Sequence, residues 1–127
     1  MPTGPEVNND FYRNQRLSMQ GIASEIGAAT ATSGTATLSD LMGKVTTDAS
    51  SAAADATYTL TLTNTKVAAG DMAFASVTLS SGTAAGVAVK DVLCGSETLT
   101  IVLVNTDADT AWSSAAFIIS YMVIKGL

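Results

Sequence analysis

The chain has 127 residues, which suits one domain, and a formal net charge of −5 with no basic block, which argues against nucleic-acid binding. Charged residues make up only 13% of the sequence, whereas an average soluble domain has about 25%. This low content of charged residues favours a surface that is partly covered by copies of the chain or by a larger assembly. A surface rich in hydroxyl groups would also explain it.

Targeting and membrane signals are weak throughout. The first ten residues, MPTGPEVNND, carry neither an apolar stretch nor an early positive charge, so we expect no secretory signal. The longest apolar run, at 115–124, is too short to cross a bilayer as a helix. Cys94 is the only cysteine, so no internal disulfide can form, and we expect a buried, inert thiol. These features predict synthesis in the cytoplasm and no membrane partner.

The first predicted element covers residues 8–27. Met19, Ile22 and Ile26 fall at helical spacing, but two glycines weaken the pattern, so both a helical and an extended arm remain open. The stretch AATATSG, at 28–34, is predicted to be a linker.

Residues 1–33 are therefore interpreted as an N-terminal arm and linker. Their apolar content argues against a purely solvated, partly disordered tail. We expect the arm to become ordered on a partner, and the side chains proposed to make that contact are Phe11, Tyr12, Arg13, Arg16, Leu17, Met19 and Ile22.

Residues 34–127 predict a β-sandwich, because short alternating segments are separated by turn residues at regular spacing. The clearest segment is TYTLTLTNTKV at 57–67, in which Tyr58, Leu60 and Leu62 share one face of a strand and threonines share the other. We expect two antiparallel sheets without intervening helices. The predicted strands are 35–39, 42–47, 57–64, 72–80, 86–93, 97–104 and 115–125.

The last predicted strand is apolar on both faces. One face carries Phe117, Ile119, Tyr121 and Val123, and the other carries Ile118, Met122 and Ile124, with Ser120 as its polar residue. Since the outer face of a two-layer sandwich normally meets water, the second face is expected to be an oligomer interface. The residues expected to fill the sandwich core are Tyr58, Leu60, Leu62, Ile119, Tyr121 and Val123.

Catalytic patterns are missing from the sequence. It has no histidine, no GxSxG elbow and no phosphate-binding glycine pattern with a lysine, so we expect no enzyme, no catalytic residues and no cofactor. Asp107 and Asp109 could touch a hard cation, but a solvated turn that caps its own backbone explains them better, and no metal site is expected. Trp112 could stack on a sugar, although a plug at the end of the sandwich is the commoner role.

The order of several segments resembles small jelly-roll domains in virion structural proteins of tailed bacteriophages, especially marine and cyanobacterial ones. The match covers about three-quarters of the chain, and Cys94 and Trp112 depart from the family pattern. The segments that carry the resemblance are GTATLSDLMGKVTT (34–47), ATYTLTLTNTKVAAGDMAFASV (56–77), GVAVKDV (86–92), ETLTIVLVNTDADTAW (97–112) and FIISYMVIK (117–125). The resemblance implies a non-enzymatic antiparallel jelly-roll sandwich at 34–127 that forms homotrimers on heads, head fibres or tail tips.

The function that these expectations favour is capsid decoration. Such a cement protein would sit on the capsid surface of the virion, with its arm across the major capsid protein, and would bridge neighbouring subunits against the pressure of the packaged DNA. The alternative is a receptor-binding or fibre-tip domain whose loops near Trp112 and 107–109 contact host glycans. No sustained heptad provides the stalk that such a tip requires. A hydrolase that uses carboxylates is the least favoured class.

Overall fold

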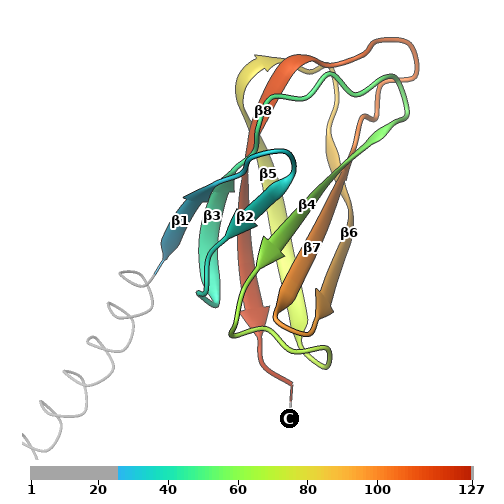
Figure 1. The fold of residues 1–127 in the computed structure, drawn as a ribbon. Helices are drawn as coiled ribbons and strands as arrows, with labels where there is room; N and C mark the ends of the chain where they lie inside the picture. The colour runs from blue at the N-terminus through green and yellow to red at the C-terminus, as the bar shows by residue number, and fades with distance from the viewer. Residues whose placement is uncertain (1–25, 127) are drawn as a thin grey trace, which may run out of the picture.

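The computed structural model describes residues 26–126 and shows a sandwich of two four-stranded sheets (Figure 1). The described residues form strands, turns and loops but no helix. The all-β prediction is therefore confirmed at the level of a β-sandwich. All seven contact residues proposed for the arm lie outside the described residues, as does the predicted helix apart from Ile26 and Gly27. The strands are β1 (Gly27–Thr30), β2 (Thr35–Thr37), β3 (Met42–Thr46), β4 (Thr57–Thr63), β5 (Met72–Thr83), β6 (Ala88–Gly95), β7 (Thr98–Val104) and β8 (Ser113–Ile124).

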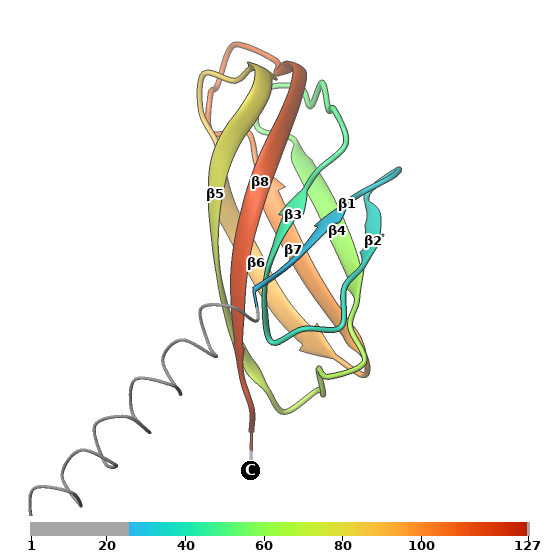
Figure 2. The same ribbon diagram turned by 90° about the vertical axis from the view of Figure 1, so that its left-hand side faces the viewer.

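Sheet A has the strand order β1-β3-β8-β5, and sheet B has the order β2-β4-β7-β6. Figure 2 looks onto sheet A, with sheet B behind it. The chain passes between the sheets at almost every connection, and among the described strands only β6 and β7 follow one another within one sheet as a hairpin. The last strand, β8, lies in the interior of sheet A between β3 and β5.

Two features differ from the expected antiparallel jelly roll. First, β1 pairs with β3, and β2 with β4, in parallel, so both sheets are mixed and the antiparallel prediction is wrong for these pairs. A jelly roll is built from two Greek keys of antiparallel strands, and the observed order does not reproduce that connectivity. Second, β1 begins at Gly27, the last residue of the predicted arm element, and continues into the stretch predicted to be a linker, so the sandwich begins before residue 34.

A two-residue turn explains how this short strand joins the sandwich. Thr32 and Thr35 exchange backbone hydrogen bonds of 2.8 and 3.0 Å, and the two residues between them both have positive φ, 50° at Ser33 and 74° at Gly34. This is the geometry of a type I′ turn. The turn carries the chain over the edge of the sandwich from β1 in sheet A to β2 in sheet B. A side chain at Gly34 would also meet the Thr59 carbonyl oxygen, 2.9 Å from its Cβ.

The core lies between the two sheets. Leu60, Leu62, Ile119, Tyr121 and Val123, all expected there, are buried. Tyr58 is half-buried, because its ring packs against the core while its hydroxyl reaches the rim and donates a hydrogen bond of 2.5 Å to Asp48. The other large apolar side chains buried there are Val45, Val67, Leu99, Ile101, Leu103, Trp112 and Phe117.

Candidate interaction surface

The two outer faces of the sandwich have different chemistry. On sheet B the inward side chains of β4 and β7 are leucine and isoleucine apart from Tyr58, and the outward ones are largely threonine. Threonine fits a pleated surface and keeps a hydroxyl group in water. This face is therefore rich in hydroxyl groups, although Leu93 of β6, which pairs with Thr100, is also 66% exposed there. Its threonines, from three strands, are Thr35, Thr37, Thr57, Thr59, Thr61, Thr63, Thr98 and Thr100.

The outer face of sheet A exposes large apolar side chains at one end. Phe74 of β5, Met122 of β8 and Met42 of β3 stand side by side in register, and Met72 and Ile124 form the next row. The alternation of β1 places Ile26, the residue before it, on the same face beside Met42. We call these six residues the apolar patch. Five of them are substantially exposed: Met72 58%, Phe74 53%, Ile124 46%, Ile26 42% and Met122 39%.

Smaller side chains follow the patch along sheet A. Ala28, Lys44, Ser120 and Ser76 make the neighbouring row, and Lys44 is the single charged side chain on the outer face of the four described strands. Because serine and alanine are short, the surface is hollowed there. One shallow hollow is lined by Phe74, Ala75, Ser76, Ser120, Tyr121 and Met122. A second is lined by Ala28, Ala29, Thr30, Lys44, Thr46 and Ile118. Shallow apolar relief of this kind suits a protein surface better than a small molecule.

The residues expected to form an oligomer interface all belong to this face. Met122 and Ile124 are part of the apolar patch, and Ile118, half-buried, lies two rows further along β8. Sequence reasoning missed Phe74 and Met72, the two most exposed members of the patch.

The signal that could have found them is the alternation MAFA at 72–75, where large residues alternate with alanine. The alternation alone does not say which set points inward. The structure settles the direction, because Ala73 and Ala75 pack against the core whereas Phe74 is exposed on the outer face.

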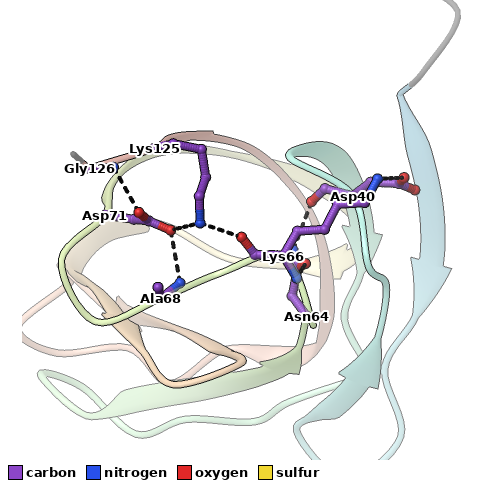
Figure 3. Close-up of polar contacts among 7 residues, drawn as sticks. All are labelled: Asp40, Asn64, Lys66, Ala68, Asp71, Lys125 and Gly126. Carbon is purple, nitrogen blue, oxygen red and sulfur yellow. Dashed lines mark hydrogen bonds and ion pairs between the residues drawn. The ribbon is translucent and has the colours of Figure 1, made fainter.

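The end of β8 is fixed beside the patch by a carboxylate (Figure 3). Asp71, next to Met72, accepts hydrogen bonds from Lys125 Nζ (2.5 Å), from Ala68 N (2.8 Å) and from Gly126 N (2.8 Å). Its side chain is only 3% exposed. Lys125 and the two backbone N–H groups lower the pKa of Asp71 to about 2. The Lys125 ammonium also donates to the Lys66 carbonyl (2.6 Å), so the chain on both sides of the Met72–Ile124 pair is held in place.

In the loops at the opposite end of the sandwich, the two side chains singled out from the sequence are engaged within the fold. Asp107 accepts hydrogen bonds from the backbone N–H groups of Asp109 (2.8 Å) and Thr110 (2.7 Å), which lower its pKa. It thus caps its own turn. Trp112 is 2% exposed, packs against Phe117 and donates from Nε1 to the Gly86 carbonyl (2.9 Å). The sugar-stacking hypothesis for Trp112 is therefore wrong, because neither face of a buried indole is open to a sugar.

Other possible chemistry is sparse in the described part of the chain. Within residues 26–126 no group of three or more Asp, Glu or Cys side chains could hold a metal ion. Cys94 is half-buried in β6, and burial raises the pKa of its thiol, which keeps it protonated and poorly reactive. No helix between residues 26 and 126 could span a membrane.

Comparison of the chain with protein-family models, curated proteins and solved structures finds no match. The apolar patch is therefore the feature on which a function can be argued.

Proposed function

We propose that the chain is a virion structural protein of a tailed bacteriophage, a cement protein that decorates the capsid as a homotrimer and bridges major capsid subunits. It would be made in the host cytoplasm and would act on the capsid surface, in a mechanical rather than a catalytic role. Two findings support this reading: the segment order that resembles phage jelly-roll modules, and a sandwich that shares eight strands in two sheets with such modules.

The apolar patch carries the proposal. Soluble domains that act alone rarely expose several large apolar side chains in one place, and a larger exposed patch usually marks an interaction site. Here the patch is joined to a face with one charge, Lys44, so little has to be desolvated when another protein covers it. Ile118, Met122 and Ile124 lie along one strand, which allows three copies of β8 to pack around a common axis.

The arm supplies the second contact in this proposal. The residues that precede β1 would reach from the trimer to the major capsid protein, burying apolar side chains while Arg13 and Arg16 pair with carboxylates of the shell. Arginine suits that pairing because its planar fork binds a carboxylate with two hydrogen bonds. The glycan-binding alternative has no comparable support, because its proposed anchor, Trp112, is buried.

The test is binding of the purified chain to phage heads that lack it, measured by co-sedimentation. The wild-type chain should saturate the heads with a copy number divisible by three. Met122→Lys should lower occupancy strongly, because an unpaired charge in a buried interface costs several kcal/mol. Thr59→Lys, on the outer face of sheet B, is the matched control and should bind as the wild type does. Absence of wild-type binding to any capsid or tail component of the source virus would overturn the proposal.

A further inference from the structure

We propose that two copies of the chain join edge to edge through their β5 strands, about a two-fold axis that passes between the two Phe74 side chains. The two β5 strands run antiparallel, so that the two copies of sheet A become one continuous sheet. This contact goes beyond the proposed trimer, which uses the outer face of β8. On the particle it would link one trimer to the next.

The outer edge of β5 is accessible in the structure. β5 is the last strand of sheet A, and β8 is its only partner among the described strands. The inward residues Ala73, Ala75 and Val77 pack against the core but stay half-exposed, whereas the inward residues of the interior strand β8 are buried. Within residues 26–126, therefore, nothing covers this edge (Figure 2).

Hydrogen bonds of β8 show which way its backbone groups point. Val123 donates its N–H to the Leu41 carbonyl (2.7 Å), and the Phe117 carbonyl accepts from the Thr47 N–H (2.8 Å), so odd-numbered residues of β8 turn toward β3. In an antiparallel strand the N–H and C=O of one residue point to the same side, and successive residues alternate. Even-numbered residues, Met122 among them, therefore turn toward β5.

The same alternation gives the direction of the backbone groups of β5. Phe74 lies opposite Met122, so these two residues exchange backbone hydrogen bonds. Their neighbours Ala73 and Ala75 then direct both N–H and C=O away from β8, toward the outer edge. This edge is a row of donors and acceptors to which another strand can add.

The other three sheet edges are protected against such pairing. β1 has four residues and β2 has three, which leaves little strand to extend. β6 carries Lys90 and Asp91 and has a register shift between Val89 and Asp91. Short length, charge and irregularity are the means by which proteins keep sheet edges apart. β5 has 12 residues without a charge or a proline, and its register shifts begin only after Leu79.

Self-complementarity identifies the partner as a second copy of the chain. The stretch 72–79 carries no charge, so it can lie antiparallel to itself without repulsion. A two-fold axis at Phe74 places the two rings directly opposite each other in a non-hydrogen-bonded pair, where side chains are closest and aromatic pairs are favourable. In this register Ala73 of one copy exchanges backbone hydrogen bonds with Ala75 of the other.

The nearest charged residue does not oppose the contact. Asp71 directly precedes β5, but Lys125 and the backbone N–H groups of Ala68 and Gly126 already bind its carboxylate, which is 3% exposed. No unpaired charge is therefore buried when the second strand arrives. The pairing also brings the two apolar patches side by side, because Phe74 belongs to the patch.

The first experiment is disulfide trapping in the full chain, with Cys94→Ser as the background. Phe74→Cys should give a covalent dimer under mild oxidation, because the two Cα atoms would lie about 4.5 Å apart, within the range of about 4.4–6.8 Å that a disulfide needs. Ser76→Cys, on the same face of the same strand, is the matched control. Its two Cα atoms would be about 14 Å apart or more, so it should stay monomeric on a non-reducing gel.

The result separates this contact from the proposed trimer. Across the two-fold axis the two Met122 residues lie about 14 Å apart, three strand spacings, so Met122→Cys should not form the edge dimer. A disulfide from Met122→Cys without one from Phe74→Cys would support the trimer and overturn the edge contact. A disulfide from Ser76→Cys alone would also overturn the proposal, because it would place the axis elsewhere.

Hydrogen exchange of the unmodified chain supplies a second measurement. Exchange at the backbone N–H groups of Ala73 and Ala75 should slow as the protein concentration rises, in proportion to the paired fraction. Those of Phe74 and Ser76, which bond to β8, should be protected at every concentration. Exchange at Ala73 and Ala75 that stays fast up to millimolar protein would overturn the proposal. Full protection in the most dilute sample would overturn it too, because the chain would then cover its own edge.

Discussion

Asn64 and Asn105 occupy equivalent positions at opposite ends of the β4–β7 pair. Each follows the last residue of its strand, is fully buried, and donates its backbone N–H to the residue before the other strand, Glu97 O and Ala56 O respectively, at 2.9 Å. Each side-chain oxygen accepts the backbone N–H two residues ahead, at 3.1 Å for Asn64 and 3.0 Å for Asn105.

The side-chain amides then fix neighbouring loops. Asn64 Nδ2 donates to the Asp40 carbonyl (2.7 Å), whereas Asn105 Nδ2 lies within 3.2 Å of three carbonyls, those of Ala52, Ala53 and Thr110. Only an amide offers a donor and an acceptor together in this volume, which explains why neither position is aliphatic or acidic.

We predict that Asn105→Asp destabilises the protein more than Asn64→Asp does. The substitution turns the donor that serves three carbonyls into a second acceptor, and an unsatisfied buried group costs about 1–3 kcal/mol. The expected loss for Asn105→Asp is therefore at the upper end of that range or beyond. Denaturant unfolding at neutral pH measures it. Equal losses at both positions would contradict the role given to the three carbonyls.

The Asp71–Lys125 pair is expected to make the stability of the fold depend on pH in acid. Because the folded-state pKa of Asp71, about 2, is below its ordinary value, ionised Asp71 stabilises the fold above pH 4, and this contribution is lost as the pH falls from about 4 to 2. Asp71→Asn should flatten the pH dependence of unfolding in that window. Lys125→Gln, which removes the strongest partner, should flatten it in part. An unchanged pH dependence in both variants would exclude the pair as a source of stability.

The Tyr58–Asp48 hydrogen bond should be measurable on its own. Its donor, Tyr58, and the Gly34 N–H both point to Asp48 Oδ1, and together they lower the pKa of that carboxyl. Tyr58→Phe should cost about 1.5–2 kcal/mol at pH 7, as expected for a hydrogen bond to a charged group. The difference from wild type should shrink in acid, once the pH falls below the lowered pKa of Asp48 and the carboxylate takes up a proton. Tyr121→Phe, whose hydroxyl donates to the neutral Asp40 carbonyl, is the control without such a pH effect.

Two substitutions in the turn between β1 and β2 are expected to change the stability of the protein in opposite directions. Ser33→Asn should stabilise the protein by about 0.5 kcal/mol, because asparagine tolerates positive φ better than serine and Asn-Gly is the preferred type I′ pair. Gly34→Ala should destabilise it by at least about 1 kcal/mol, because the residue has positive φ and its Cβ would press on the Thr59 carbonyl. Thermal unfolding of both variants checks the two signs together.

Local patterns in the sequence were sufficient to predict most strands. Alternation in 57–63 and turn residues between segments located β2 through β8, since both depend on neighbouring residues alone. β1 was missed because GAAT has little strand propensity, and it becomes a strand only through its partner β3. The parallel pairs could not be predicted for the same reason, as they follow from the turn at Ser33 and Gly34 that crosses the sandwich edge.

The candidate surface was predictable only in part. The doubly apolar pattern of 117–124 indicated the outer residues Met122 and Ile124, because any strand with two apolar faces needs a second cover. The contribution of Phe74 could not be predicted, because the alternation MAFA does not say which of its two faces meets the core. The residues proposed for the arm lie outside the described part of the chain, and their roles stay predictions.

The interior position of β8 has a consequence for folding. Of the eight strands, β8 is the last to leave the ribosome. It lies between β3 and β5 in sheet A and pairs with both, and these two strands do not pair with each other. The four strands of sheet A therefore cannot assemble during synthesis until β8 has emerged. Up to that point β5 lacks its partner strand in sheet A, and its apolar side chains on both faces are not yet covered by β8. Among the described strands, the β6–β7 hairpin has the most local pairing and is the natural place for structure to begin. We expect refolding to be slow, on the order of milliseconds to seconds as in other sandwiches dominated by distant pairings, and to require protection from aggregation while β8 is missing.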